Sequence, residues 1–117
     1  MQIDIQARQL SMTRSLNRYT QRRIRFALLR FEENIQRVSI WLSDVNGPRG
    51  GKDKHCRLQL MLAGNADVII EDTQENLYVA INRAIERASH SLVRKLDRQK
   101  SLLLRSRSVM YETSVSV

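Results

Sequence analysis

The chain has 117 residues, with 20 Lys and Arg against 12 Asp and Glu, which gives a formal net charge of +8. This length suits one domain with a hydrophobic core and leaves no room for a second. The positive charge favours a polyanion as partner, either a nucleic acid or an anionic membrane surface. The apolar runs are far shorter than the roughly 20 residues of a membrane-spanning helix, so a transmembrane protein is excluded.

The first segment, residues 2–8, alternates between apolar and polar side chains, and this pattern predicts a half-buried strand. The chain opens without a charged segment followed by an apolar run, so export is not expected. Cys56 is the single cysteine and cannot form an intrachain disulfide. Both features indicate a cytoplasmic protein.

The second segment is free of Gly and Pro, and Ser11 or Thr13 is placed to cap a helix that runs to about Phe31. Residues 36–44 return to a period of two, with Trp41 on the outward side, and predict a second strand. A strand, a helix and a strand in succession predict that the two strands are parallel if they are neighbours.

Residues 46–53 hold the only Pro and three of the four Gly, which predicts a loop. Two further strands follow around Gly64 and form a hairpin. Asp72 or Thr73 is expected to cap the last helix, which should run to about Lys100. The remaining residues, 101–117, lose their periodicity and are expected to form a flexible C-terminal tail.

The predicted order is β-α-β-β-β-α, an α+β fold with a four-stranded mixed sheet in one domain over residues 1–100. Each strand has one apolar face, so both helices are expected to pack on the same side of the sheet. The opposite face should remain in contact with water.

Basic side chains form rows on both predicted helices. At about 100° per residue, the second helix carries a row about 140° around from its apolar stripe. This row consists of Arg83, Arg87, His90, Arg94 and Arg98. The first helix carries a comparable row of Arg14, Arg18, Arg22 and Arg25, flanked by Arg23 and Arg30.

Such a row can be no more than a solvated helix face. Two rows on the same side of a sheet favour a binding surface, however, and they would merge with Arg49, Lys52 and Lys54 of the loop. The planar guanidinium group binds phosphate in a bidentate manner and stacks on bases, which suits RNA better than lipid headgroups. The alternatives are a basic structural protein, a regulator of a protein partner, or a double-stranded-RNA module with similar elements in another order.

Three short segments resemble the hibernation-promoting factor and ribosome-associated inhibitor family of bacteria, over roughly residues 1–100. They are the opening Met-Gln-Ile-Asp-Ile, the pair Met12-Thr13 where the first helix begins, and the stretch from Glu71 to Ile81, with Asn-Leu-Tyr-Val-Ala-Ile at its end. The glycine-rich loop departs from the short members of this family and indicates a distinct subgroup.

The resemblance implies a translation inhibitor that binds small-subunit ribosomal RNA in the decoding region. By position, the RNA contacts of the family correspond to Arg22, Arg23, Arg25, Arg30, Arg83, Arg87, His90, Arg94 and Arg98. Arg49, Lys52 and Lys54 are possible further contacts from the loop. We expect the free protein to be a monomer that binds no membrane.

No pattern of catalytic residues is apparent, so an enzyme with a small-molecule substrate is not expected. Asp53, His55 and Cys56 could ligate a metal, but no second Cys/His pair completes four ligands, and a buried thiol explains Cys56 better. The loop glycines lack a Gly-Lys-Ser/Thr ending, so a nucleotide P-loop is not supported. No cofactor is therefore predicted. Trp41 and Tyr78 could stack on bases or simply pack.

Overall fold

A computed structural model describes the backbone of residues 1–44 and 53–115, and the side chains within 1–44 and 53–100. The elements in chain order are β1 (Gln2–Arg8), α1 (Arg14–Leu28), the 3-10 helix η1 (Leu29–Asn34), β2 (Ile35–Asp44), β3 (Lys54–Leu62), β4 (Val68–Gln74) and α2 (Leu77–Val115). The predicted α+β fold with the order β-α-β-β-β-α is confirmed.

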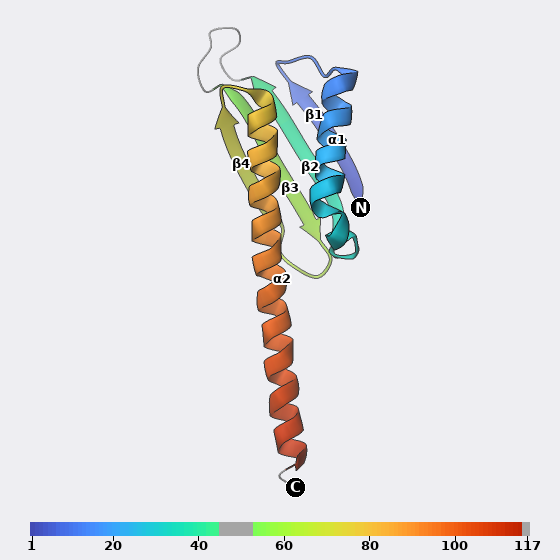
Figure 1. The fold of residues 1–117 in the computed structure, drawn as a ribbon, viewed down its shortest axis with the longest axis vertical. Helices are drawn as coiled ribbons and strands as arrows, with labels where there is room; N and C mark the ends of the chain where they lie inside the picture. The colour runs from blue at the N-terminus through green and yellow to red at the C-terminus, as the bar shows by residue number, and fades with distance from the viewer. Residues whose placement is uncertain (45–52, 116–117) are drawn as a thin grey trace.

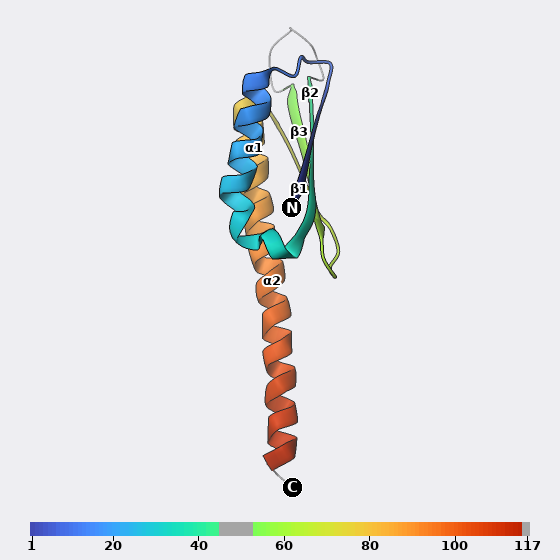
Figure 2. The same ribbon diagram turned by 90° about the vertical axis from the view of Figure 1, so that its right-hand side faces the viewer.

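The four strands form one sheet in the order β1-β2-β3-β4. β1 runs parallel to β2, while β2–β3 and β3–β4 are antiparallel. The parallel pair requires a crossover, and α1 with η1 provides it. Both helices cover the same face of the sheet, as predicted, and within residues 1–44 and 53–115 no helix lies on the other face (Figures 1 and 2).

The core lies between this sheet face and the two helices. Alternate residues of the strands point into it, and α1 contributes side chains four residues apart, among them Leu16, Ile24 and Leu28. The inner stripe of α2 is almost as regular. Its fully buried members are Ala80, Ile81, Ala84, Ile85, Ala88 and Leu92. The apolar stripes of the sequence therefore fix which helix faces remain available for binding.

Three predicted helix boundaries differ from the structure. α1 ends at Leu28, and the tighter η1 turns the chain toward β2, so Phe31 packs against the core from outside the α-helix. The predicted caps of the last helix are wrong because β4 continues to Gln74. Asn76 is the cap, and its Oδ1 accepts a hydrogen bond of 2.8 Å from the backbone N–H of Tyr78. Of the two predicted caps of α1, Ser11 and Thr13, the structure shows Thr13, whose Oγ1 accepts a hydrogen bond of 3.0 Å from Leu16 N–H.

α2 also ends later than predicted. It continues past Lys100 to Val115 and projects beyond the sheet, which gives the molecule dimensions of 72 × 24 × 18 Å (Figure 1). The division into a domain at 1–100 and a flexible tail at 101–117 stays a prediction.

Candidate nucleic-acid interface

The outer face of α1 is basic and carries an exposed aromatic ring. Because Leu16, Ile24 and Leu28 point inward, the positions between them point outward. They form a shallow hollow bordered by Arg18, Gln21, Arg22, Arg25, Phe26 and Leu29. Phe26 is 82% exposed. The Phe26 ring therefore contributes nothing to the core and lies beside the guanidinium groups that border the hollow.

The two helices are joined by polar contacts at the end where both begin. Asn82 of α2 accepts two hydrogen bonds through Oδ1, one from the Tyr19 hydroxyl at 2.9 Å and one from Arg23 Nε at 3.0 Å. The rings of Tyr19 and Tyr78 meet edge to face, with centroids 4.8 Å apart. These contacts hold Arg23 between the helices. They also account for Tyr78, which packs although it is half exposed.

Further along, a groove runs between the helices, and basic side chains border it from both sides. One hollow is bordered by Arg30, His90, Val93 and Arg94. The adjoining hollow is bordered by Arg23, Phe26, Ala27, Ile85, Glu86, Ser89 and His90. His90 borders both hollows, so the two adjoin each other. We call this surface, with Arg23, Phe26, Arg30, His90 and Arg94, the interhelical groove.

Arg30 reaches the interhelical groove from η1 rather than from α1. Its guanidinium carbon lies 4.6 Å from the centroid of the Phe31 ring. A cation over an aromatic face is attracted by the ring quadrupole, which limits where the side chain can go. The 3-10 helix η1 therefore places the Arg30 guanidinium opposite α2, and the Phe31 ring restricts its position.

The basic row of α2 is divided in the folded protein. Arg83 and Arg87 lie over β4, where Asp72 is almost fully buried. Arg83 Nε is 3.1 Å and Arg87 Nη1 is 3.8 Å from Asp72 Oδ2, and Arg87 also donates to the Glu71 carbonyl at 2.8 Å. His90 and Arg94 belong to the interhelical groove instead. The sheet thus supplies the acidic partner of Arg83 and Arg87.

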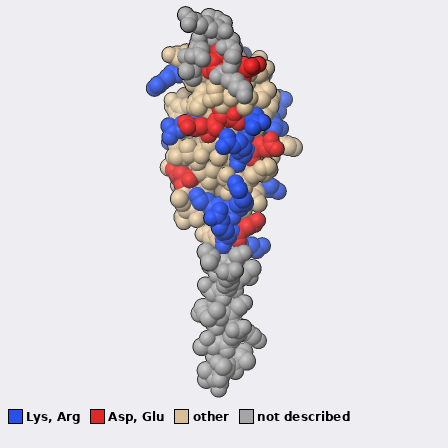
Figure 3. All heavy atoms as spheres, turned by 90° about the vertical axis from the view of Figure 1, so that its left-hand side faces the viewer, with Lys and Arg blue, Asp and Glu red and all other residues tan. Residues whose placement is uncertain are grey.

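The distribution of charge on the surface agrees with this division of the basic row of α2. Figure 3 faces the side of the molecule that carries β4 and shows acidic and basic side chains intermixed over the upper part of the domain. Basic side chains gather lower down, toward the end where α2 leaves the sheet. Arg98 is exposed at that end of the described side chains.

Of the three basic loop residues predicted to contact RNA, only Lys54 is among the described residues. Arg49 and Lys52 lie outside the described residues. Lys54 opens β3 and donates a hydrogen bond of 2.6 Å to Asp44, and it lies 3.6 Å from the buried Asp53. The hydrogen bond to Asp44 raises the pKa of the Lys54 ammonium. Its charge is thus held by two carboxylates of its own chain.

The three candidate metal ligands do not converge. Cys56 is fully buried in the core, whereas His55, the next residue along β3, lies on the opposite face of the sheet. Within residues 1–44 and 53–115, no group of three ligating side chains is close enough to hold a metal ion. Burial, together with the negative charge of Asp72 on the neighbouring strand, raises the pKa of the Cys56 thiol to about 12.

Sequence reasoning missed Phe26 as a residue of this surface. The available signal was its position, two residues after Ile24 and outside the apolar stripe of α1. In the part of the chain that the structure describes, no helix has the length and hydrophobicity to cross a bilayer.

Residues 3–100 match the sequence profile of a family described as sigma 54 modulation protein / S30EA ribosomal protein. A search of the curated proteins finds no match.

Two solved structures share the fold. The N-terminal domain of Protein Y from Thermus thermophilus aligns with a TM-score of 0.67 and 23% identity, over 80% of this chain and 98% of that domain. A ribosomal subunit interface protein from Coxiella burnetii aligns with a TM-score of 0.70 and 12% identity, over 83% of this chain and 99% of the other.

Proposed function

The chain belongs to the sigma 54 modulation protein / S30EA ribosomal protein family, and from that premise we propose that it binds the small ribosomal subunit and inhibits translation as a hibernation factor. RNA of the decoding region lies against the basic residues of both helices in this proposal. The protein acts in the cytoplasm by binding alone, as a monomer when free. It uses neither a cofactor nor a small-molecule substrate.

The observation that carries the proposal is the convergence of Arg30, His90 and Arg94 on one hollow from two separate elements. Arg30 and Arg94 carry like charges, which repel each other when the groove is empty, and a phosphate placed between them relieves that repulsion. Arg23 and Phe26 extend the same surface. Phe26 adds a ring on which an unpaired base can stack. Glu86 on the border keeps the groove from being uniformly positive.

The other predicted contacts fall into two groups by their surroundings. Arg22 and Arg25 border the hollow on the outer face of α1, and Arg98 is exposed beyond the sheet, so all three can extend the RNA surface. Arg83 and Arg87 already bind Asp72. These two have a structural task besides any contact with RNA.

The name of one structural neighbour agrees with this function. The protein from Coxiella burnetii is described as a ribosomal subunit interface protein. A basic groove on one face of a small domain is a suitable surface for RNA at such an interface.

The test is sedimentation with purified ribosomal subunits in sucrose gradients. We expect the wild type to travel with the small subunit. Arg30→Gln and Arg94→Gln should each weaken binding about tenfold, because each removes a charge-assisted hydrogen bond to phosphate. The double variant should stay at the top of the gradient.

Arg37→Gln is the matched control. Arg37 has the same charge but lies on the sheet and pairs with Asp4 at 3.1 Å, so this variant should travel with the subunit like the wild type. Failure of the wild type to bind would contradict the proposal, as would unchanged binding by the double variant.

A second measurement tests the inhibition itself. The wild type should reduce protein synthesis in a reconstituted translation reaction and compete with transfer RNA for the small subunit. The double variant should do neither. If the wild type binds the small subunit but does not inhibit protein synthesis, the proposed binding in the decoding region is wrong.

A further inference from the structure

The face of the sheet that carries no helix is ordered in transverse rows. Strand register places Gln6 beside Trp41 and Trp41 beside Arg57. The next row holds Arg8, Ser43 and His55 at the corresponding positions. Because residues two apart share a face, both rows project on the same side. This side is opposite the interhelical groove.

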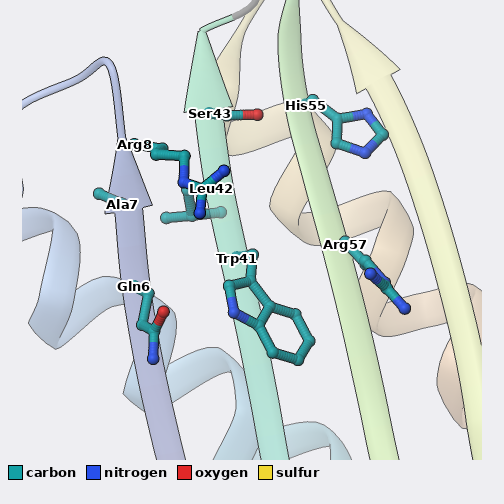
Figure 4. A pocket seen from close by; sticks show the side chains of 8 residues that line it. All are labelled: Gln6, Ala7, Arg8, Trp41, Leu42, Ser43, His55 and Arg57. Atoms are coloured by element: carbon teal, nitrogen blue, oxygen red, sulfur yellow. The ribbon is translucent and has the colours of Figure 1, made fainter.

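The two rows enclose a hollow of about 300 Å³. Ser43 is small and lies between the longer Arg8 and His55, which leaves the space open. Figure 4 shows Trp41, Arg57 and His55 projecting from the sheet surface, with the helices behind the sheet. The volume is at the lower end of the range for small-molecule sites, roughly 300–1,000 Å³.

Trp41 forms a flat platform in this hollow. In Figure 4 the indole ring is seen face-on, lying over the sheet between β2 and β3. Its inner side lies against the sheet, and the ring is only partly buried. The Arg57 guanidinium lies over the ring, with its carbon 5.4 Å from the ring centroid. An aromatic ring beside a guanidinium plane is a surface on which nucleobases stack.

The charges around the platform favour an anion. Arg8 is exposed, and nearly half of the Arg57 side chain is exposed. Glu71 is the acidic group nearby, and its carboxylate is divided between Arg57 at 4.0 Å and His55 at 3.5 Å. His55 is further held by Thr73, whose hydroxyl lies 2.7 Å from Nδ1. Among the described side chains that line this hollow or contact its lining, the two arginines Arg8 and Arg57 outnumber the one carboxylate, Glu71.

We propose that this hollow is a binding site for a nucleotide, with the base stacked on Trp41 and the phosphate held by Arg8 and Arg57. The nucleotide is either free or an unpaired position in a single RNA strand, since both offer the same base and phosphate. The site goes beyond the proposed ribosome binding of the helices. The sheet separates the two surfaces, so each can be tested without the other.

Trp41 is the only tryptophan of the chain, so its fluorescence reports on this site alone. The ligands to titrate into the full-length protein are GMP, a single-stranded hexauridylate and ribose 5-phosphate. We expect saturable quenching by the oligonucleotide. Quenching by GMP as well would identify a free nucleotide as sufficient, and its absence would identify an RNA strand as the ligand.

Arg8→Ala and Arg57→Ala should each weaken this binding about tenfold, because each loses a charge-assisted contact with the phosphate. Trp41→Phe, followed by calorimetry, should retain most of the binding because it keeps a ring for stacking. Circular dichroism checks that each variant is folded. The groove variant Arg30→Gln/Arg94→Gln should bind like the wild type here even though ribosome binding is lost.

Three results would overturn the proposal. The first is the absence of Trp41 quenching both with GMP and with the oligonucleotide. The second is equal binding of ribose 5-phosphate, which has no base. The third is binding that persists unchanged in both arginine variants. None of these results bears on the helical surface, which the sedimentation experiment tests.

Discussion

At the scale of single residues, adjacent positions have opposite chemistry because they point to opposite sides of a strand. Cys56 lies in the core beside Asp72 of the neighbouring strand, and His55 lies on the open face beside Thr73. The same rule separates Trp41, on the open face, from the buried Leu42. A residue's task in this protein is decided first by the face on which it lies.

The raised pKa of Cys56 makes stability depend on pH. The folded state raises this pKa from 9.0 to about 12. As the pH rises, the thiol of the unfolded chain therefore ionises before that of the folded protein. The contribution of the neutral thiol to the stability of the folded state is complete below pH 9 and is lost as the pH rises toward 12. At pH 10 this loss is roughly 1 kcal/mol relative to pH 7.

Urea denaturation at pH 7 and pH 10 measures this loss in the wild type and in Cys56→Ala. The alanine variant is less stable at both pH values because it leaves a small cavity, but its stability should fall less between them. Equal losses in the two proteins would show that other groups cause the alkaline sensitivity.

Phe26 is expected to affect binding and not stability. Its side chain is 82% exposed, so Phe26→Ala should change the free energy of unfolding by less than about 0.5 kcal/mol. If a base stacks on the ring, RNA affinity should fall at least about fivefold. Thermal unfolding and filter binding to small-subunit RNA measure the two effects. Ile69→Ala, which removes a 50% exposed apolar side chain from β4 on the sheet, is the control and should bind normally.

At the scale of elements, the start and the orientation of α2 depend on β4. The strand continues through Thr73 to Gln74, so the helix begins only at Leu77. The same strand carries Asp72, which binds the first two arginines of the basic row. The helix is therefore positioned by polar contacts at its first turns in addition to its apolar stripe.

The cap of α2 can be tested by a pair of substitutions. Asn76→Ala should lower the free energy of unfolding by about 1 kcal/mol, because it removes the acceptor for an N–H of the first turn. Thr73→Ala should cost less, because Thr73 lies in the strand and bonds His55 at the surface. Chemical denaturation of both variants measures the difference. A larger loss for Thr73→Ala would contradict the assignment of the cap.

Asp72→Asn separates the structural from the binding role of Arg83 and Arg87. The substitution keeps the shape of the side chain but removes the charge that both arginines face. Stability should fall by about 1 kcal/mol, a modest amount because both guanidinium groups are largely exposed. RNA affinity should rise several-fold, since the two arginines become available to phosphate. Denaturation and filter binding measure the two effects, and a fall in affinity would show that Asp72 orients these arginines for RNA.

At the scale of the whole molecule, the net charge of +8 is distributed unequally. The helical side presents the interhelical groove and the outer arginines of α1, while many charges along the sheet pair with each other, such as Arg37 with Asp4. A polyanion is thus expected to meet the helical side first. The open sheet face holds a smaller site for a single nucleotide.

RNA binding should depend strongly on salt. Contacts with about six phosphates predict a slope near −4 for the logarithm of affinity against the logarithm of salt concentration. The groove variant Arg30→Gln/Arg94→Gln should have a slope smaller by about 1 to 2, because two phosphate contacts are lost. Titrations at several salt concentrations measure both slopes. A slope near zero in the wild type would exclude phosphate contacts as the main source of affinity.

The sequence by itself determined the element order, the parallel β1–β2 pair and the side of the sheet on which the helices pack. It could do so because apolar periodicity is a local property, and each stripe can be buried in only one way. The same local reasoning restricted the cap of α1 to Ser11 or Thr13 and indicated that Cys56 is buried. The matched family segments added the expectation of ribosomal RNA as partner.

Only the tertiary structure decided which basic residues act together. Arg83 and Arg94 belong to one row along the helix, yet Asp72 on β4 holds the first and Arg30 on η1 meets the second at the groove. The hollow around Trp41 likewise depends on three strands in one register. Ion pairs and grooves join residues far apart in the chain, and their distances are fixed only when the strands and helices pack against each other.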